Sequence, residues 1–195
     1  MSHKDNFREY PERPIVGVGG VILRADRVLL VKRAKPPRHG AWSLPGGAQE
    51  TGEKAAAAFS RELKEETNLD IAPAGFIAVV DFIEPDDAGA VRHHYTLLDY
   101  WAESEAGQAR PGSDVAEVAW APLDRLEDYD LWDQTREVIR TAVALRAAQR
   151  KRSSHHSLKG HLRTAGIAVV FGLTAYGAIH LLLWILRTLG LMGEA

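Results

Sequence analysis

Hydrophobic and polar positions repeat with two periods along the first 150 residues, and these periods predict the secondary structure. Apolar, β-branched runs bounded by turn residues predict strands, whereas a repeat of three to four residues predicts helices. The expected strands cover residues 15–23, 28–32, 74–83, 91–101 and 115–120, and the expected helices cover residues 53–67 and 131–150. Strands mixed with helices that cover both faces indicate an α/β fold, an α/β/α sandwich around a mixed sheet.

The expected helix over residues 53–67 carries three glutamates on one face. Glu62, Glu65 and Glu66 are spaced i, i+3 and i+4, so their side chains project within an arc of about 100°. Like charges at this spacing destabilise a helix by roughly 0.2–0.5 kcal/mol per pair. The cluster is therefore favourable mainly around a cation such as Mg²⁺ or Mn²⁺, which prefers oxygen ligands. The alternative is a solvated helix face with ion pairs such as Arg61 with Glu65.

The spacing around this helix resembles the sequence box of the Nudix hydrolase family. The preceding loop, residues 42–47, reads WSLPGG, and the matching positions are Gly47, Glu53, Arg61, Glu62, Leu63, Glu65, Glu66 and Leu69. Asn68 stands where the family has a glycine. Asparagine is next best suited to the left-handed conformation that ends a helix, so we expect the helix to end at the same place. The resemblance implies the Nudix α/β/α sandwich.

The resemblance also implies a metal-dependent hydrolase that cleaves a phosphoanhydride by attack of activated water. As implied metal ligands for Mg²⁺ or Mn²⁺ we take Glu62, Glu65, Glu66 and the carbonyl oxygen of Gly47. Arg61 is expected to hold the carboxylate of Glu53 in position, a supporting role that makes its loss costly. The alternative for Glu53 is a favourable charge in the first helical turn.

The general base stays open among three acidic residues. Glu66 comes first, followed by Asp114 and Glu117, for which a polar loop beside a strand is the alternative interpretation. Further candidate substrate contacts are Arg33, Arg38, Trp42 and His94. For the two arginines the alternative is a plain surface charge, and for His94 it is ordinary packing in a strand.

The resemblance implies a substrate in which a nucleoside diphosphate is linked to another group. Pro85 lies sixteen residues after Leu69, a position that the family associates with ADP-ribose hydrolases. The stretch FIEPDDAGAVRHHYTLLDYWAE is also similar to bacterial members of the ADP-ribose pyrophosphatase type. We therefore expect ADP-ribose or a related nucleotide sugar. The alternatives are an 8-oxo-dGTP-type sanitising hydrolase and a non-catalytic nucleotide sensor, against which the intact glutamates argue.

Composition and charge exclude several classes of site. The chain has no cysteine, so disulfides and thiolate catalysis are excluded. Residues 1–150 hold 19 Lys and Arg against 25 Asp and Glu, whereas residues 151–195 hold five against one. An acidic head argues against a nucleic-acid binder, which would show a basic face. Because dimers are frequent in the resembled family, two heads are also expected to pair.

The tail carries a second pattern, an apolar run without charged residues. Residues 165–186 contain no Asp, Glu, Lys or Arg over 22 residues, close to the roughly 20 that a helix needs to cross a bilayer. We predict a Nudix domain over residues 1–149, a basic polar linker over 150–164, a transmembrane helix over 165–187 and a short tail over 188–195. The alternative is a long helix buried against the head or in a dimer.

The expected location of the protein depends wholly on this tail. Residues 1–14 are polar and charged and predict no signal peptide. Lys and Arg gather on the head side of the apolar run, so the positive-inside rule predicts a cytoplasmic head anchored in the membrane by a C-terminal single span.

Overall fold

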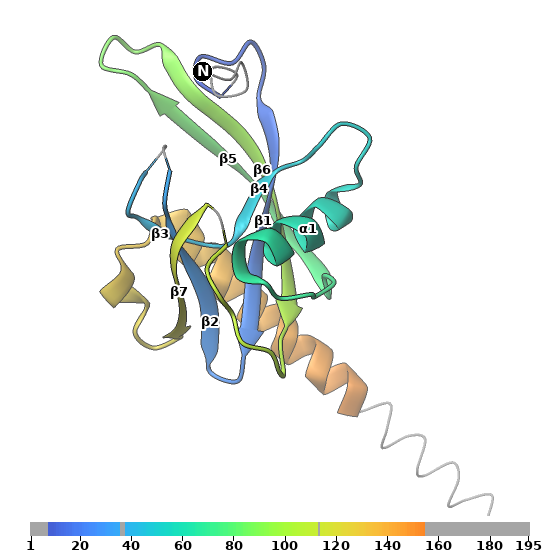
Figure 1. Cartoon of the computed structure of the whole chain (residues 1–195). Coiled ribbons are helices and arrows are strands. Elements are labelled where there is room, and N and C mark those ends of the chain that lie inside the picture. Colours follow the sequence, from blue (N-terminus) through green and yellow to red (C-terminus); the bar gives the residue numbers. More distant parts are fainter. Residues whose placement is uncertain (1–7, 36–37, 113, 155–195) are drawn as a thin grey trace, which may run out of the picture. The chain divides into compact units, whose positions relative to one another are not determined.

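Seven strands and two α-helices make up the part of the chain that the structure, a computed structural model, describes, namely residues 8–35, 38–112 and 114–154 (Figure 1). The elements are, in order, β1 (Ile15–Arg24), β2 (Arg27–Arg33), β3 (Trp42–Ser43), β4 (Gly46–Ala48), α1 (Ala55–Thr67), β5 (Gly75–Pro85), β6 (Val91–Glu103), β7 (Val115–Pro122) and the 3-10 helix η1 (Leu126–Tyr129). A second α-helix follows over residues 133–154.

The strands form one mixed sheet in the order β3-β2-β1-β6-β5, with β4 paired to β1 and β7 paired to β2. β1 runs antiparallel to β2 and parallel to β6. β1 and β2 are the hairpin that the sequence predicts, and its turn places Ala25 at a φ of 50°. The expected mixed sheet is confirmed.

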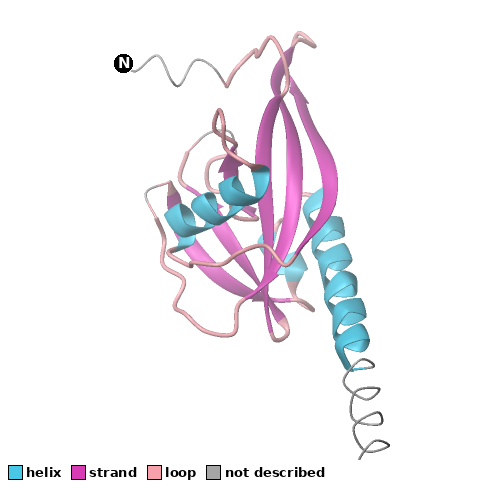
Figure 2. Cartoon of the chain, turned by 90° about the vertical axis from the view of Figure 1, so that its right-hand side faces the viewer, coloured by secondary structure: helices cyan, strands magenta, loops and turns pink. Residues whose placement is uncertain are grey.

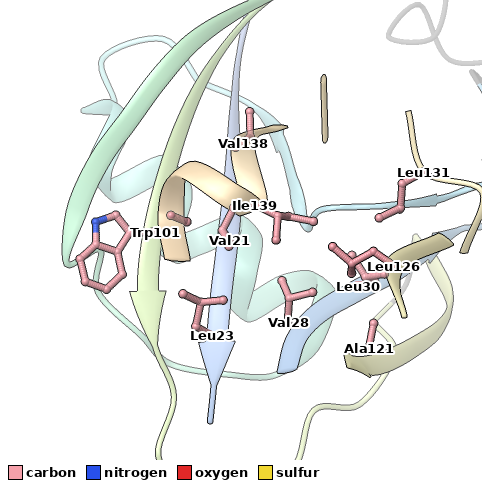
Figure 3. Close-up of a cluster of buried hydrophobic side chains, with 11 residues drawn as sticks. Val21, Leu23, Val28, Leu30, Trp101, Ala121, Leu126, Leu131, Val138 and Ile139 are labelled. Atoms are coloured by element: carbon pink, nitrogen blue, oxygen red, sulfur yellow. The ribbon is translucent and has the colours of Figure 1, made fainter. Parts of the chain in front are cut away.

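Helices cover both faces of this sheet (Figure 2). On one face, Phe59 and Leu63 of α1 pack with Ile22 of β1 in one hydrophobic cluster. On the other face, Val138 and Ile139 of the second helix pack with residues of β1, β2 and β6 (Figure 3). Two separate apolar clusters, one on each face, confirm the α/β/α sandwich and leave the ends of the strands to carry a site.

The ends of α1 agree with the sequence at one terminus and differ at the other. Asn68 caps the C-terminus in the left-handed region, at a φ of 59°, as expected of a residue that replaces glycine. The helix begins at Ala55, two residues later than expected. Glu53 therefore precedes the helix, and its carboxylate accepts a hydrogen bond from the backbone N–H of Glu50 at 3.2 Å.

Three short elements were not expected from the sequence. β3 and β4 lie within the loop over residues 42–47, and the 3-10 helix follows β7. Two or three residues are too short to show a hydrophobic period, so only the sheet partners of β3 and β4 define them.

The prediction of a membrane-spanning helix is wrong for the part of the chain that can be described. Over residues 8–35, 38–112 and 114–154, no helix is long and apolar enough to cross a membrane. The physical reason is that the last described helix, over residues 133–154, bears charged residues along its length, among them Arg136, Glu137, Arg140, Arg150 and Lys151. The predicted span, residues 165–187, lies outside the described residues.

The predicted location is corrected with the span. A cytoplasmic head held by a C-terminal membrane anchor has no support in the described helices, and the anchor was its only basis. Contacts divide the chain into two units, Met1–Leu145 and Arg146–Ala195. The first unit carries the sheet and all expected site residues. The expected boundaries at residues 149, 164 and 187 stay predictions.

One buried carboxylate interrupts the apolar interior. Asp99 in β6 is 4% exposed, and its side chain lies against Gly19 of β1, where a Cβ would collide with it. Burial alone raises the pKa of Asp99 to about 6. None of the described residues donates a hydrogen bond to this carboxylate, so its charged form is disfavoured in the folded state.

This burial makes the free energy of unfolding depend on pH. The folded-state pKa of Asp99 lies above the unfolded value of 3.8, so the contribution of this group to stability is fully present below that value and is lost as pH rises toward about 6. The shift corresponds to about 3 kcal/mol. We expect Asp99→Asn to raise the urea midpoint at pH 7.5 and to change it little at pH 4. Asp87→Asn, at an exposed turn, is the control, and equal effects of both variants at pH 7.5 would contradict the prediction.

Candidate active site

The loop that ends in β4 packs directly on α1. The backbone N–H of Gly46 donates a hydrogen bond of 2.9 Å to the carboxylate of Glu66. Gly47 pairs with Val18 of β1, and a Cβ at Gly47 would collide with the carboxylate of Glu62. The two glycines are therefore required by close approach, because a side chain at Gly47 would collide with α1 and one at Gly46 would collide with the backbone of β1 at Val18.

Arg61 joins the loop to the helix. Its guanidinium donates two hydrogen bonds of 2.9 Å to the two carboxylate oxygens of Glu53 and one of 3.1 Å to the carbonyl oxygen of Ala48. The same guanidinium contacts Glu62 at 2.8 Å and Glu65 at 3.4 Å. A two-pronged pair of this kind fixes orientation as well as charge. The hydrogen bonds from Arg61 lower the pKa of Glu53.

Glu66 is a half-buried acid of the cluster. Burial raises the pKa of Glu66 to about 7; the negative charges of Glu62 and Asp114 add to this rise, whereas the Gly46 N–H and Arg33 oppose it. Burial also raises the pKa of Glu62, opposed first by its hydrogen bond from Arg61. Two half-buried, like-charged carboxylates near each other are costly, and a cation between them would relieve that cost.

The acidic residues have the donor chemistry of a hard cation site, with oxygen ligands only. In the described part of the chain, however, no group of three or more His, Asp or Glu residues is gathered so as to hold a metal ion. Glu62 and Glu65 each give one oxygen to Arg61, and Glu65 is 57% exposed. The residue types fit Mg²⁺ or Mn²⁺, and Glu62 and Glu65 each keep a second carboxylate oxygen that is not bonded to Arg61.

A group of cations lies opposite the acids. Arg33, at the end of β2, has its pKa lowered by burial, opposed by the charge of Glu66 and by Tyr95. Arg8 and Arg38 lower it further. Burial raises the pKa of Tyr95, and Arg8 and Arg33 oppose that rise. These groups are near enough to act on one another electrostatically, so the site has an acidic side and a basic side.

An aromatic group adjoins the basic side. Phe82 of β5 lies 6.4 Å from Tyr95 of β6 and 5.6 Å from Trp132, measured between ring centroids. All three rings are half-buried. Trp42 lies elsewhere, in an edge-to-face contact of 5.4 Å with Tyr129 against the hydrophobic core. Half-buried rings offer flat faces on which a nucleobase can stack.

The remaining expected residues lie at the margin of the site. Asp114 pairs with Lys35 at 2.5 Å and acts electrostatically on Glu66. Glu117 pairs with Lys32 at 3.6 Å and is 58% exposed. His94 is half-buried and pairs with Ile83 of β5.

The sequence did not single out the aromatic group or Arg8. Tyr95 directly follows His94, and because side chains alternate along a strand the two point to opposite faces. Tyr95 acts electrostatically on Arg33. The signal that could have found the aromatic group is that Phe82 and Tyr95 lie on consecutive expected strands, where an antiparallel hairpin pairs them directly.

Comparison with known proteins gives the same assignment. The family model described as NUDIX domain matches residues 13–142. An "ADP-ribose pyrophosphatase" from Methanocaldococcus jannaschii is 34% identical over 113 residues, which cover 58% of this chain and 64% of that protein. An "8-oxo-(d)GTP phosphatase" from Mycolicibacterium smegmatis is 31% identical over 108 residues, covering 55% and 31%. The chain thus spans less than two thirds of either relative.

A solved structure agrees with the fold. The crystal structure of a MutT Nudix hydrolase from Burkholderia pseudomallei superposes with a TM-score of 0.59 at 32% identity, covering 67% of this chain and 98% of that one. The family match covers the sheet, α1 and all of the acidic cluster. On this match, together with the Gly47-to-Glu66 geometry, the chain belongs to the Nudix hydrolase family.

Proposed function

We propose that this chain is a metal-dependent Nudix pyrophosphohydrolase that cleaves a phosphoanhydride of a nucleoside diphosphate derivative, with ADP-ribose or a related nucleotide sugar as substrate. The observation that carries the proposal is Glu66. It is a half-buried carboxylate held by the Gly46 N–H, and the negative charge of Glu62 and the positive charge of Arg33 both act on it. Acids with raised pKa values near a cation suit a site that handles phosphate and protons.

Each residue of the site has a proposed part in the reaction. Glu62, Glu65, Glu66 and the Gly47 carbonyl would hold Mg²⁺ or Mn²⁺, which supplies charge neutralisation and activates water when bound. Glu66 accepts the proton of the attacking water. Arg61 positions Glu53 and the start of the helix. Arg33 binds the phosphoryl oxygens from the opposite side, with Arg38 near it.

Asp114 and Glu117 remain the second and third candidates for the base. Asp114 is the better placed of the two, because its charge already acts on Glu66, whereas Glu117 is linked to Lys32. The role of His94 as a substrate contact stays a prediction. Pairing of two heads stays a prediction.

The substrate class is supported by the aromatic group and by the relatives. Tyr95 acts electrostatically on Arg33 and belongs to the same ring cluster as Phe82 and Trp132, so a base stacked on that cluster would have its phosphates toward the arginines. Pro85 ends β5 in the same hairpin. ADP-ribose is favoured by the name of the archaeal relative. An 8-oxo-dGTP-type activity is the second candidate, favoured by the name of the mycobacterial relative.

The test uses the full chain with a panel of ADP-ribose, nucleotide sugars, dinucleoside polyphosphates and 8-oxo-dGTP, with Mg²⁺ and with chelator. We expect metal-dependent release of AMP from ADP-ribose, measured by chromatography. Preference for 8-oxo-dGTP would establish the second candidate. A folded protein that binds nucleotides and hydrolyses none of them would favour the sensor interpretation.

Removing the charge of Glu66 tests the observation on which the proposed function rests. Glu66→Gln keeps the shape and the hydrogen bond from Gly46, so we expect the protein to stay folded and kcat to fall by about 10²–10⁴. Glu105→Gln, an exposed residue away from the site, is the matched control. Near-normal kcat in Glu66→Gln would exclude Glu66 as the base and move the role to Asp114, to be checked with Asp114→Asn.

Replacing the guanidinium of Arg61 by the single amine of lysine tests its positioning role. Arg61→Lys keeps the positive charge and cannot donate to both oxygens of Glu53 at once. We expect kcat to fall by roughly 10- to 100-fold, as for other groups that orient metal ligands, with KM changed less. The measurement is steady-state kinetics beside Arg125→Lys, a surface control. Equal kinetics in the two variants would show that Arg61 contributes only charge.

A further inference from the structure

The loop that follows β6 packs on the C-terminal end of α1. We call residues 104–112 the connecting loop, and in Figure 1 it rises from the lower end of β6 past α1 toward β7. The backbone N–H of Gly112 donates a hydrogen bond of 2.9 Å to the carbonyl oxygen of Glu66. The N–H of Arg110 donates one of 2.9 Å to the carbonyl oxygen of Thr67. Because the last carbonyl groups of a helix have no partner within it, the connecting loop satisfies two of them.

The contact at Gly112 is made by bare backbone on the residue that carries the proposed base. A Cβ at Gly112 would collide with the carbonyl oxygen of Glu65. The carbonyl oxygen of Gly112 accepts a hydrogen bond of 3.3 Å from the N–H of Val115, which begins β7. Glu66 lies in the last turn of α1, where a helix frays readily. The path of the connecting loop therefore decides how firmly the backbone of Glu66 is held.

Arg24, the last residue of β1, holds the other end of the connecting loop. Its Nε–H donates a hydrogen bond of 3.0 Å to the carbonyl oxygen of Ser104. Its Nη2 lies 2.7 Å from the Ser104 hydroxyl oxygen and 2.9 Å from the carbonyl oxygens of both Ala106 and Gly107. The same guanidinium lies over the ring of Trp120, 4.1 Å from the ring centroid. One half-buried side chain thus binds three residues of the loop and stacks on β7.

The connecting loop has no helix or strand of its own. A segment of this kind keeps its path only through individual contacts, and its stability is local. The contacts lie at its two ends, with Arg24 at the start and the carbonyl groups of Glu66 and Thr67 at the finish. If the start is released, the hydrogen bonds at the finish lose the support that keeps them closed.

We propose that Arg24 is a positioning residue for the hydrolytic site. By holding the connecting loop it keeps the Gly112 N–H on the Glu66 carbonyl oxygen, and so keeps the Glu66 carboxylate where it can accept the proton of the attacking water. This inference rests on the proposed function for the role of Glu66. Arg24 acts through the loop and touches no reacting atom, so its loss lowers kcat and leaves substrate capture in place.

The first test is the kinetics of Arg24→Ala with the preferred substrate of the panel. We expect kcat to fall roughly 10- to 100-fold, the effect of a small displacement of a reacting group, and KM to stay within about twofold. Arg24→Lys keeps the charge without the planar guanidinium and recovers part of the loss. Arg27→Ala removes an exposed arginine of the same hairpin and is the matched control. Thermal unfolding is measured beside the kinetics, and a lower Tm with unchanged kcat in Arg24→Ala would overturn the proposal.

A second variant tests the far end of the loop without altering Arg24. The methyl group of Gly112→Ala would push the loop from the carbonyl oxygen of Glu65 and break the hydrogen bond to Glu66. We expect kcat to fall in the same direction as in Arg24→Ala, and adding Arg24→Ala to this variant to lower it little further. Fully multiplicative effects would show that Arg24 does not act through Gly112.

Amide hydrogen exchange of the full chain, followed by NMR, tests the positioning without any reaction. The N–H groups of Arg110 and Gly112 are hydrogen-bonded, so we expect both to exchange slowly in the wild type. Arg24→Ala is expected to speed both by about tenfold or more, because it releases the loop that carries them. Arg27→Ala is expected to leave them unchanged. Equal exchange in the two variants would contradict the proposal.

The two measurements separate failure of this inference from failure of the proposed function. Turnover by the wild type, with both kcat and the exchange of Gly112 unchanged in Arg24→Ala, overturns only this inference. A wild type that hydrolyses no nucleotide of the panel overturns the proposed function. Faster exchange of Gly112 in Arg24→Ala would then still support the hold of Arg24 on the connecting loop.

Discussion

The guanidinium of Arg61 holds together the parts of the chain on which the acidic site depends. One guanidinium binds both oxygens of Glu53, which precedes α1, and the carbonyl oxygen of Ala48, which ends β4. Because Arg61 itself belongs to α1, these bonds close the loop between strand and helix on the helix surface. Gly46 and Gly47 can then meet Glu66 and Glu62 at close range. Without this closure the buried carboxylates would be open to water, and the cause of the raised pKa of Glu66 would be lost.

The acidic and the basic residues of the site lie on different elements of the fold. The acids lie on α1, which is packed into the sandwich through Phe59 and Leu63. Arg33 and Arg38 come from the end of β2 and the loop after it. Arg33 is half-buried, and the charge of Glu66 opposes the lowering of its pKa by burial.

The sequence predicts those parts of the molecule that depend on local pattern. Leu63 and Phe59 repeat at helical spacing, and Asn68 takes the left-handed conformation at the helix end. The sequence does not predict contacts between distant segments. The ion pair of Glu9 with Arg92, which lies 83 residues further along the chain, is one such contact. Asp99 also could not be predicted as buried, because its partner position is a glycine on a neighbouring strand.

The tail shows a second limit of prediction from the sequence. The apolar composition of residues 165–186 reports only the free energy of transferring such a segment from water into a bilayer. The helices that the structure describes give no support to a membrane span. The sandwich over the first unit needed no such inference, since each strand and helix there is confirmed by a partner across the sheet.

The absence of free space at Gly47 has a consequence for how this enzyme can change. A loop that touches a carboxylate through a bare backbone cannot be widened by substitution, since even a methyl group would collide with Glu62. On the proposed function, new specificities would arise at the aromatic group, where Phe82 and Tyr95 belong to a hairpin with exposed side chains such as Ile83. Mutation would then change the choice of substrate while the loop that contacts the acidic cluster stayed nearly invariant.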